Sequence, residues 1–181
     1  MKNKRLLLLT IVVLGVLLNT ASNNWAQPKV ERKVPIITHA FAIDRGYYGY
    51  IWKIYIEAED PDGDMLRIAS VVDQTGYGHY PTDWIYLKSQ YKGHFKGYIQ
   101  WNTFSSQTSY LTEWTQITLK VSVFDRAGNE SNVVIFPFTF ETGAASVFPP
   151  APFDQGDLPR LGYIQIDLFD PTHMAGRNGF D

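Results

Sequence analysis

The sequence predicts an all-β fold, a single antiparallel sandwich of about seven strands. Three observations support this prediction. Short segments between residues 34 and 142 are rich in aromatic and β-branched residues and are separated by turn residues. The same region contains no convincing amphipathic helix pattern. Aromatic residues make up 15% of the chain, and such large side chains suit the thin core between two sheets.

Residues 51–64 contain the clearest strand and the clearest turn. Apolar and polar side chains alternate along the first half, which predicts a strand with one buried face and one exposed face. The buried face carries Trp52, Ile54, Ile56 and Ala58, and the exposed face carries Lys53, Tyr55 and Glu57. In the second half, Pro61 presets the backbone for a turn and Gly63 can adopt a positive φ without a Cβ clash. The stretch therefore predicts a strand that ends in a tight acidic turn.

The remaining strands follow from the same alternation. The predicted strands cover residues 35–42, 48–59, 65–72, 84–88, 95–101, 113–124 and 132–141. One face of the third strand is expected to carry Leu66, Ile68 and Val72, and the inner face of the sixth Ile117, Leu119, Val121 and Val123. Proline cannot donate to a strand ladder, so Pro35 and Pro137 indicate that the first and last strands are edge or bulged strands.

Seven short strands within about 110 residues are typical of the immunoglobulin-like sandwich. More specifically, the chain resembles bacterial cadherin-like and immunoglobulin-like repeats at two strand ends, IYIEAEDPDGDML (54–66) and ITLKVSVFDRAGNESN (117–132). The resemblance covers roughly residues 35–142 and implies a non-catalytic adhesive, spacer or binding unit of a secreted protein. Such repeats usually occur in tandem, whereas this chain holds a single copy of the pattern.

The first 26 residues have the pattern of an export signal. Lys2, Lys4 and Arg5 precede an apolar run of 13 residues, shorter than the roughly 20 that a membrane-spanning helix needs. Cleavage is expected after Ala26 or Ala21, and an uncleaved anchor is the alternative. Without the signal's three basic residues the chain keeps 13 of its 16, against 18 acidic residues, a net charge of −5. We therefore expect a secreted or periplasmic protein with no stable membrane span and no nucleic-acid partner.

The chain after the signal is expected to hold one domain and a tail. The predicted organisation is a signal peptide (1–26), an N-terminal extension (27–33), the sandwich (34–143), a Pro-rich linker (144–161) and a C-terminal tail (162–181). Within the tail, residues 162–169 alternate and place Ile164, Ile166 and Leu168 on one face. We expect this segment to join an edge strand of its own sandwich, one of those marked by Pro35 and Pro137. A partner's sheet or a loose tail are the alternatives.

The acidic turn is a candidate calcium site. Asp60, Asp62 and Asp64 lie within five residues and offer the hard oxygen ligands that Ca²⁺ prefers. The resemblance adds Asp125 at the end of a neighbouring strand. An EF-hand is excluded, because the twelfth position of the loop would be Val71 and not a glutamate. The alternative is a structural turn whose carboxylates accept hydrogen bonds from turn N–H groups.

The connection over residues 76–92 is a second candidate site, because it concentrates aromatic side chains. Those predicted to bind a ligand are Tyr77, Tyr80, Trp84 and Tyr86. Flat rings in a loop can stack on sugar rings or anchor a protein partner. The alternative is that the rings fold back and cap one end of the sandwich.

The sequence offers no catalytic constellation. It has no cysteine, which excludes thiolate nucleophiles and thiolate metal sites, and its four histidines lack helical ligand spacing. His39 lies in a predicted strand and is expected to be a surface or a satisfied core residue. The favoured function is therefore an exported, non-catalytic binding or adhesion module with a protein or glycan partner. The alternatives are an envelope assembly subunit that docks through its C-terminal segment and a small carbohydrate-active enzyme.

Overall fold

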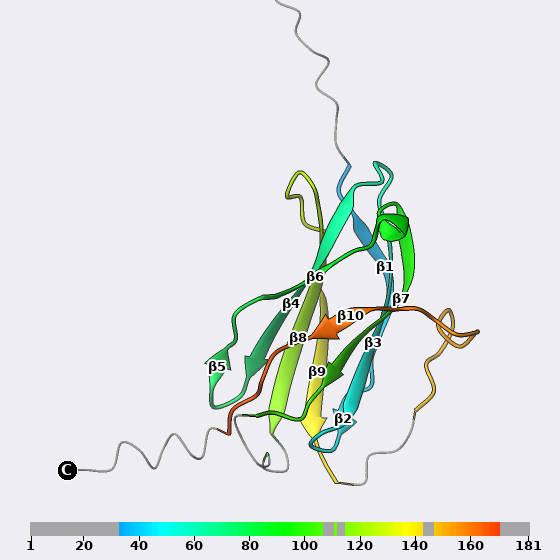
Figure 1. Cartoon of the computed structure of the whole chain (residues 1–181). Coiled ribbons are helices and arrows are strands. Elements are labelled where there is room, and N and C mark those ends of the chain that lie inside the picture. Colours follow the sequence, from blue (N-terminus) through cyan, green and yellow to red (C-terminus); the bar gives the residue numbers. More distant parts are fainter. Residues whose placement is uncertain (1–32, 107–110, 112–114, 143–146, 171–181) are drawn as a thin grey trace, which may run out of the picture. The chain divides into compact units, whose positions relative to one another are not determined.

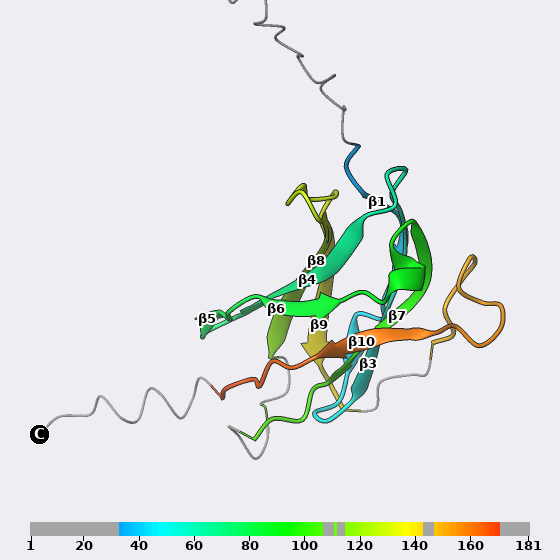
Figure 2. The same ribbon diagram turned by 45° about the horizontal axis from the view of Figure 1, so that its top comes forward.

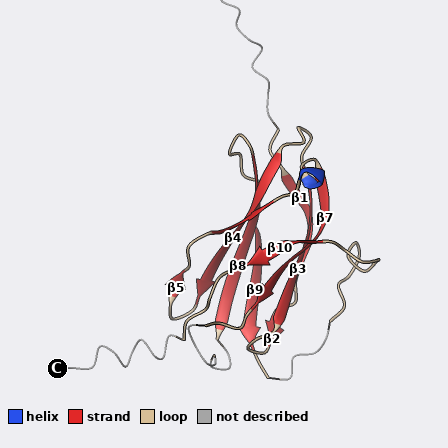
Figure 3. Ribbon diagram, in the orientation of Figure 1, coloured by secondary structure: helices blue, strands red, loops and turns tan. Residues whose placement is uncertain are grey.

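The computed structural model describes residues 33–106, 111, 115–142 and 147–170, whose elements are drawn in Figures 1 and 3. These described residues form ten strands and one 3-10 turn, η1 (Ser89–Tyr91). The strands are β1 (Ile36–Phe41), β2 (Arg45–Gly46), β3 (Ile51–Glu59), β4 (Met65–Gln74), β5 (Gly78–His79), β6 (Asp83–Tyr86), β7 (His94–Asn102), β8 (Gln116–Asp125), β9 (Val134–Phe140) and β10 (Arg160–Ile164). The predicted signal peptide, residues 1–26, and nearly all of the predicted extension, 27–33, lie outside the described residues.

The strands form two open sheets. A four-stranded sheet has the order β1-β3-β7-β10, and a six-stranded sheet has the order β2-β9-β8-β4-β5 with β6 also paired to β4. The sequence predicts purely antiparallel sheets, and this part of the prediction is wrong. Both sheets are mixed, because β10 runs parallel to β7 and β2 runs parallel to β9. In Figure 2, β10 lies between β6 and β7. The all-β prediction is confirmed, and the strand total exceeds the predicted seven.

The core lies between the two sheets and follows the predicted alternation. On β3 the four predicted inward side chains, Trp52, Ile54, Ile56 and Ala58, are fully buried. On β8 the predicted inward side chains Ile117, Leu119, Val121 and Val123 are buried as well. The two sheets meet where the Trp52 and Phe138 rings pack with centroids 4.6 Å apart. Burial of such large apolar side chains is the main stabilising contribution to a sandwich of this kind.

Two strands show how local irregularities change the predicted pattern. A bulge between Met65 and Arg67 shifts the start of β4, so that Met65 is buried while Leu66 is half-buried. Ile68 and Val72 are buried as predicted. Pro137 is exposed on β9, whose far side pairs with β2 only at Thr139 and Phe140, so β9 is close to an edge strand.

The C-terminal segment joins the four-stranded sheet of its own chain. β10 pairs in parallel with β7, so the docking edge is β7 and not the edges that Pro35 and Pro137 indicate. The predicted apolar face is buried, with exposed fractions of 4% for Ile164, 8% for Ile166 and 0% for Leu168. Gly162 lets the backbone of β10 approach β6 closely, because it has no Cβ. Any Cβ at this position would overlap the side chain of Ile85 on β6.

Side chains of the sandwich hold the backbone that follows β10. Hydrogen bonds to its carbonyl oxygens run from Trp101 Nε1 to Ile166 (3.0 Å), from Ser105 Oγ to Leu168 (2.5 Å) and from Gln74 Nε2 to Phe169 (2.6 Å). In turn, the Phe169 N–H donates to the Tyr80 hydroxyl at 2.9 Å. These bonds satisfy main-chain groups that lack a neighbouring strand, so the segment is fixed beyond the end of β10.

Candidate functional site

The predicted calcium ligands lie close together. The two buried ones, Asp60 and Asp125, accept hydrogen bonds from donors in their own turns. Asp60 accepts hydrogen bonds from the N–H groups of Asp62 and Asp64, each at 3.1 Å. Asp125 accepts from the backbone N–H of Asn129 at 2.8 Å and from its side-chain amide at 2.6 Å. These are the contacts that the structural-turn interpretation predicts.

Asp64 is the member of this acidic group whose negative charge is the least favourable. Burial, a hydrogen bond with the Asp60 side chain and the nearby charges of Asp125, Asp60 and Asp62 raise the pKa of Asp64 above its ordinary value. Asp62 is exposed, and its carboxylate accepts a hydrogen bond from the Lys33 N–H at 2.8 Å. Across the described ranges, no group of three or more His, Cys, Asp or Glu side chains is placed to hold a metal ion. The calcium site therefore stays a prediction.

Two of the four predicted ligand-binding aromatic residues pack inside the fold. Tyr80 is 6% exposed, and its ring stacks on Tyr77 with centroids 4.7 Å apart. Tyr77 in turn stacks on Phe169 at 5.0 Å and 9° between the ring planes. The Tyr80 hydroxyl donates to Gln74 Oε1 at 2.5 Å, and burial raises the pKa of Tyr80 to about 12. This stack holds the C-terminal segment, as the capping alternative predicts.

The other two residues lie on β6 and face outward from the six-stranded sheet. The guanidinium of Arg67 lies 3.8 Å from the centroid of the Trp84 ring, and Trp84 meets Phe124 edge-on at 5.3 Å. Tyr86 is 63% exposed. The structure therefore separates the predicted aromatic site into a packed pair, the buried Tyr80 with the half-buried Tyr77, and an exposed pair on β6.

A pocket that was not among the predicted sites lies on the outer face of the four-stranded sheet. It has a volume of about 430 Å³, and we call it the aromatic pocket. Its rings are Tyr55 on β3, Tyr98 on β7, and Phe148 and Phe153 from the loop over residues 147–159; its charged groups are Lys53, Asp154 and Asp157. The described part of the predicted linker thus forms one wall of this pocket and is not a free spacer.

Ring contacts fix the floor of the aromatic pocket. Tyr55 and Tyr98 are direct neighbours in the β3–β7 register, with centroids 5.7 Å apart. Phe153 is only 3% exposed and packs on Tyr55 at 5.7 Å, which anchors the loop to the sheet. Phe148 is 87% exposed, so its ring is free to contact a ligand. Burial, followed by the neighbouring Tyr98, raises the pKa of Tyr55 above its ordinary value.

The charged groups of the pocket are available for a ligand. The Lys53 ammonium lies 4.8 Å from the centroid of the Tyr98 ring. Asp154 and Asp157 are exposed, and neither forms an ion pair with any other residue that the structure describes. The pocket therefore combines flat apolar faces with hydrogen-bonding groups of both charges, the usual composition of a small-ligand site.

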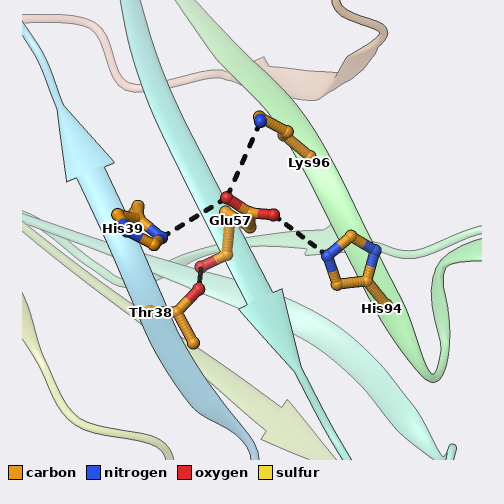
Figure 4. Close-up of polar contacts among 5 residues, drawn as sticks. All are labelled: Thr38, His39, Glu57, His94 and Lys96. Atoms are coloured by element: carbon orange, nitrogen blue, oxygen red, sulfur yellow. Dashed lines mark hydrogen bonds and ion pairs between the residues drawn. The ribbon is translucent and has the colours of Figure 1, made fainter. Parts of the chain in front are cut away.

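A second polar cluster on the same face is centred on Glu57, as Figure 4 shows. Its carboxylate contacts His39 Nδ1 on β1 at 3.4 Å, His94 Nε2 on β7 at 3.2 Å and Lys96 Nζ at 3.9 Å. The two imidazoles lie on opposite sides of the carboxylate, so they are not arranged around a common ion. Lys96 also lies 6.0 Å from the centroid of Phe153, which links the Glu57 cluster to the aromatic pocket.

The pocket has a weak signature in the sequence. The outward face of β3 was predicted to carry Lys53, Tyr55 and Glu57. It thus combines an aromatic ring with charged groups, as the pocket does. The loop over residues 147–159 holds two phenylalanines, which is unusual for a free linker. What the sequence lacks is the position of the loop, because that depends on where Phe153 packs.

No protein family matches the chain, and no curated protein matches it. Among the described residues, no helix has the length and apolar character needed to cross a membrane.

Proposed function

We propose that this chain is an exported, non-catalytic binding module that holds a glycan in the aromatic pocket on the four-stranded sheet. The observation that carries the proposal is the pocket itself, a hollow of about 430 Å³ with four rings, one ammonium and two carboxylates. Sugar rings present apolar C–H faces and a rim of hydroxyls, so they match flat aromatic faces beside hydrogen-bonding groups.

The strand order supports an immunoglobulin-like topology for the module. The sheet neighbours β1-β3-β7 and β9-β8-β4 correspond in order to strands A-B-E and G-F-C of that sandwich. β10 occupies the place beside strand E that strand D fills in the constant-type fold, although it runs parallel to its neighbour. Sandwiches of this class carry their functions on surface faces and loops, so the fold agrees with a binding role without specifying it.

The two alternative functions have less support. An assembly subunit that docks through its C-terminal segment needs that segment to be free, whereas Ile164, Ile166 and Leu168 are buried in their own sandwich. A glycosidase needs one carboxyl group held in its protonated form by an apolar environment. The two carboxylates of the pocket, Asp154 and Asp157, are both exposed on one loop, which favours binding over hydrolysis.

The proposal is tested by comparing Phe148→Ala with Tyr86→Ala. Both wild-type rings are exposed, one in the aromatic pocket and one on the opposite sheet, so neither change should disturb the core. We expect Phe148→Ala to weaken retention on polysaccharide affinity gels about fivefold, because a stacked ring contributes on the order of 1 kcal/mol. Tyr86→Ala should leave retention unchanged, and both variants should keep the wild-type melting temperature.

Two results would contradict the proposal. If Tyr86→Ala is the variant that loses retention, the ligand binds at β6, which holds two of the four aromatic residues predicted from the sequence. If the wild-type protein is retained on none of a panel of neutral, acidic and amino polysaccharides, the glycan-binding function is wrong.

A further inference from the structure

The charges of the aromatic pocket are unequal. Two carboxylates, Asp154 and Asp157, face the hollow together with one ammonium, that of Lys53. The nearby Lys96 does not alter this balance, because its ammonium forms an ion pair with the Glu57 carboxylate at 3.9 Å. The pocket therefore has a surplus of negative charge that none of the described residues neutralises through an ion pair.

The rings of the pocket favour positive charge as well. Lys53 Nζ lies 4.8 Å from the Tyr98 centroid and Lys96 Nζ lies 6.0 Å from the Phe153 centroid, so two ring faces already attract ammonium groups. The face of an aromatic ring carries the negative part of its quadrupole and stabilises a nearby cation. Phe148 is largely exposed and has no such lysine partner among the described residues, which leaves its ring face for a cation that arrives with the ligand.

We propose that the ligand of the aromatic pocket is an amino sugar, a glycan whose rings carry a protonated amine. This inference rests on the proposed function, because it specifies the ligand class of the same site. The amine would lie between the Phe148 ring and the carboxylates of Asp154 and Asp157, while the sugar ring stacks on the pocket floor. Lys53 would donate a hydrogen bond to a ring hydroxyl.

The same arrangement disfavours the other glycan classes. An acidic sugar would bring a carboxylate toward Asp154 and Asp157, and like charges in a partly enclosed pocket repel each other. A neutral sugar would leave both carboxylates without a compensating cation. Specificity in this pocket is therefore electrostatic and should weaken as salt screens the charges.

The inference is tested by calorimetric titration of the full chain with four tetrasaccharides. These are a fully deacetylated glucosamine tetramer, its N-acetylated counterpart, a neutral glucose tetramer and a galacturonate tetramer. We expect the glucosamine tetramer to bind at least tenfold more tightly than each of the others. Asp154→Asn and Asp157→Asn should each weaken its binding several-fold and leave neutral-tetramer binding within about twofold. The matched control is Glu59→Gln, which removes one exposed carboxylate outside the pocket.

The outcomes separate the two proposals. Equal binding of the amino and neutral tetramers, with both lost in Phe148→Ala, would overturn the amino-sugar inference and keep the glycan-binding function. Preferred binding of galacturonate would overturn the inference in the same way. Loss of glucosamine binding in Glu59→Gln to the same extent as in the two aspartate variants would also overturn it, because the effect would be one of overall charge. Failure of all four tetramers to bind would count against both proposals.

Discussion

Asp64 lies among carboxylates whose charges oppose its own. Its Oδ1 atom is buried without a hydrogen-bond donor, and burial together with Asp60, Asp125 and Asp62 raises its pKa above the ordinary 3.8. The folded chain therefore binds this proton more tightly than the unfolded chain does. The stabilising contribution is fully present below pH 3.8 and is lost as the pH rises through the higher folded pKa.

We therefore expect Asp64→Asn to raise the melting temperature at pH 7 and to change it little near pH 3. The amide removes the charge that is unfavourable at pH 7, and at low pH the wild-type carboxyl is already neutral. Thermal unfolding followed by circular dichroism at the two pH values measures the difference. Glu59→Gln serves as the control, since it removes an exposed carboxylate outside the acidic turn. A lower melting temperature for Asp64→Asn at pH 7 would mean that the carboxylate is stabilising.

The calcium hypothesis gives a separate prediction at the same residues. Bound Ca²⁺ would stabilise the folded chain by mass action, so the melting temperature would be higher in millimolar Ca²⁺ than in a chelator. Asp125→Asn would remove that difference. The hydrogen bonds that Asp60 and Asp125 accept from their own turns favour the structural interpretation, under which the two melting curves coincide.

The acidic turn also shows which residue-scale features a sequence can predict. The turn over residues 60–64 was expected from Pro61 and Gly63, and Gly63 has φ +71°. The proximity of Asp64 to Asp125 was suggested only by the family resemblance. It depends on the β4–β8 register, in which Met65 pairs with Asp125, and an alternation pattern in either strand alone does not contain that register.

At the scale of elements, the docking of β10 depends on glycines. A Cβ at Gly162 would overlap Ile85, and one at Gly97 would overlap the Pro159 carbonyl oxygen and the Leu161 side chain. The alternation of residues 162–169 correctly predicted the buried face of the segment. The edge it joins was predicted incorrectly, because prolines indicate where a ladder is weak but do not show where two backbones can approach closely.

We expect Gly162→Ala to destabilise the protein by about 1–3 kcal/mol, the usual cost of inserting a methyl group into a packed site. The fall in melting temperature should be accompanied by faster proteolysis of the C-terminal segment, because β10 would separate from β6 first. Gly93→Ala is the matched control: its added Cβ would meet only the Gly63 Cα, at an ordinary contact distance of 3.8 Å. Equal melting temperatures for the two variants would show that Ile85 moves aside for the added methyl group and that close packing at Gly162 is not required.

At the scale of the whole molecule, the sequence predicted the two-sheet core better than the surface. Core positions repeat every second residue along a strand, so the alternation in the sequence predicts that Trp52, Ile54 and Ile56 are buried. The two-residue strands β2 and β5 are too short to show any alternation. The aromatic pocket combines β3, β7 and a loop that follows β9, and nothing local to any of these segments specifies that they meet.

The C-terminal segment is expected to be required for the stability of the whole sandwich. Burying Ile164, Ile166 and Leu168 contributes roughly 1.5–3 kcal/mol each, and domains of this size have a total stability of only about 5–15 kcal/mol. A chain that ends after Pro159 would also leave the Trp101 indole N–H without the Ile166 carbonyl that it binds at 3.0 Å.

We therefore predict that the chain ending at residue 159 melts far below the full-length protein and that its tryptophan fluorescence shifts to the red. The red shift is expected because Trp52 and Trp101, which are fully buried in the complete chain, would contact water. The control is a chain ending at residue 170, which keeps every contact of the docked segment described above and should melt like the full-length protein. Unchanged stability of the chain ending at 159, together with loss of an oligomer, would instead support an assembly role for this segment.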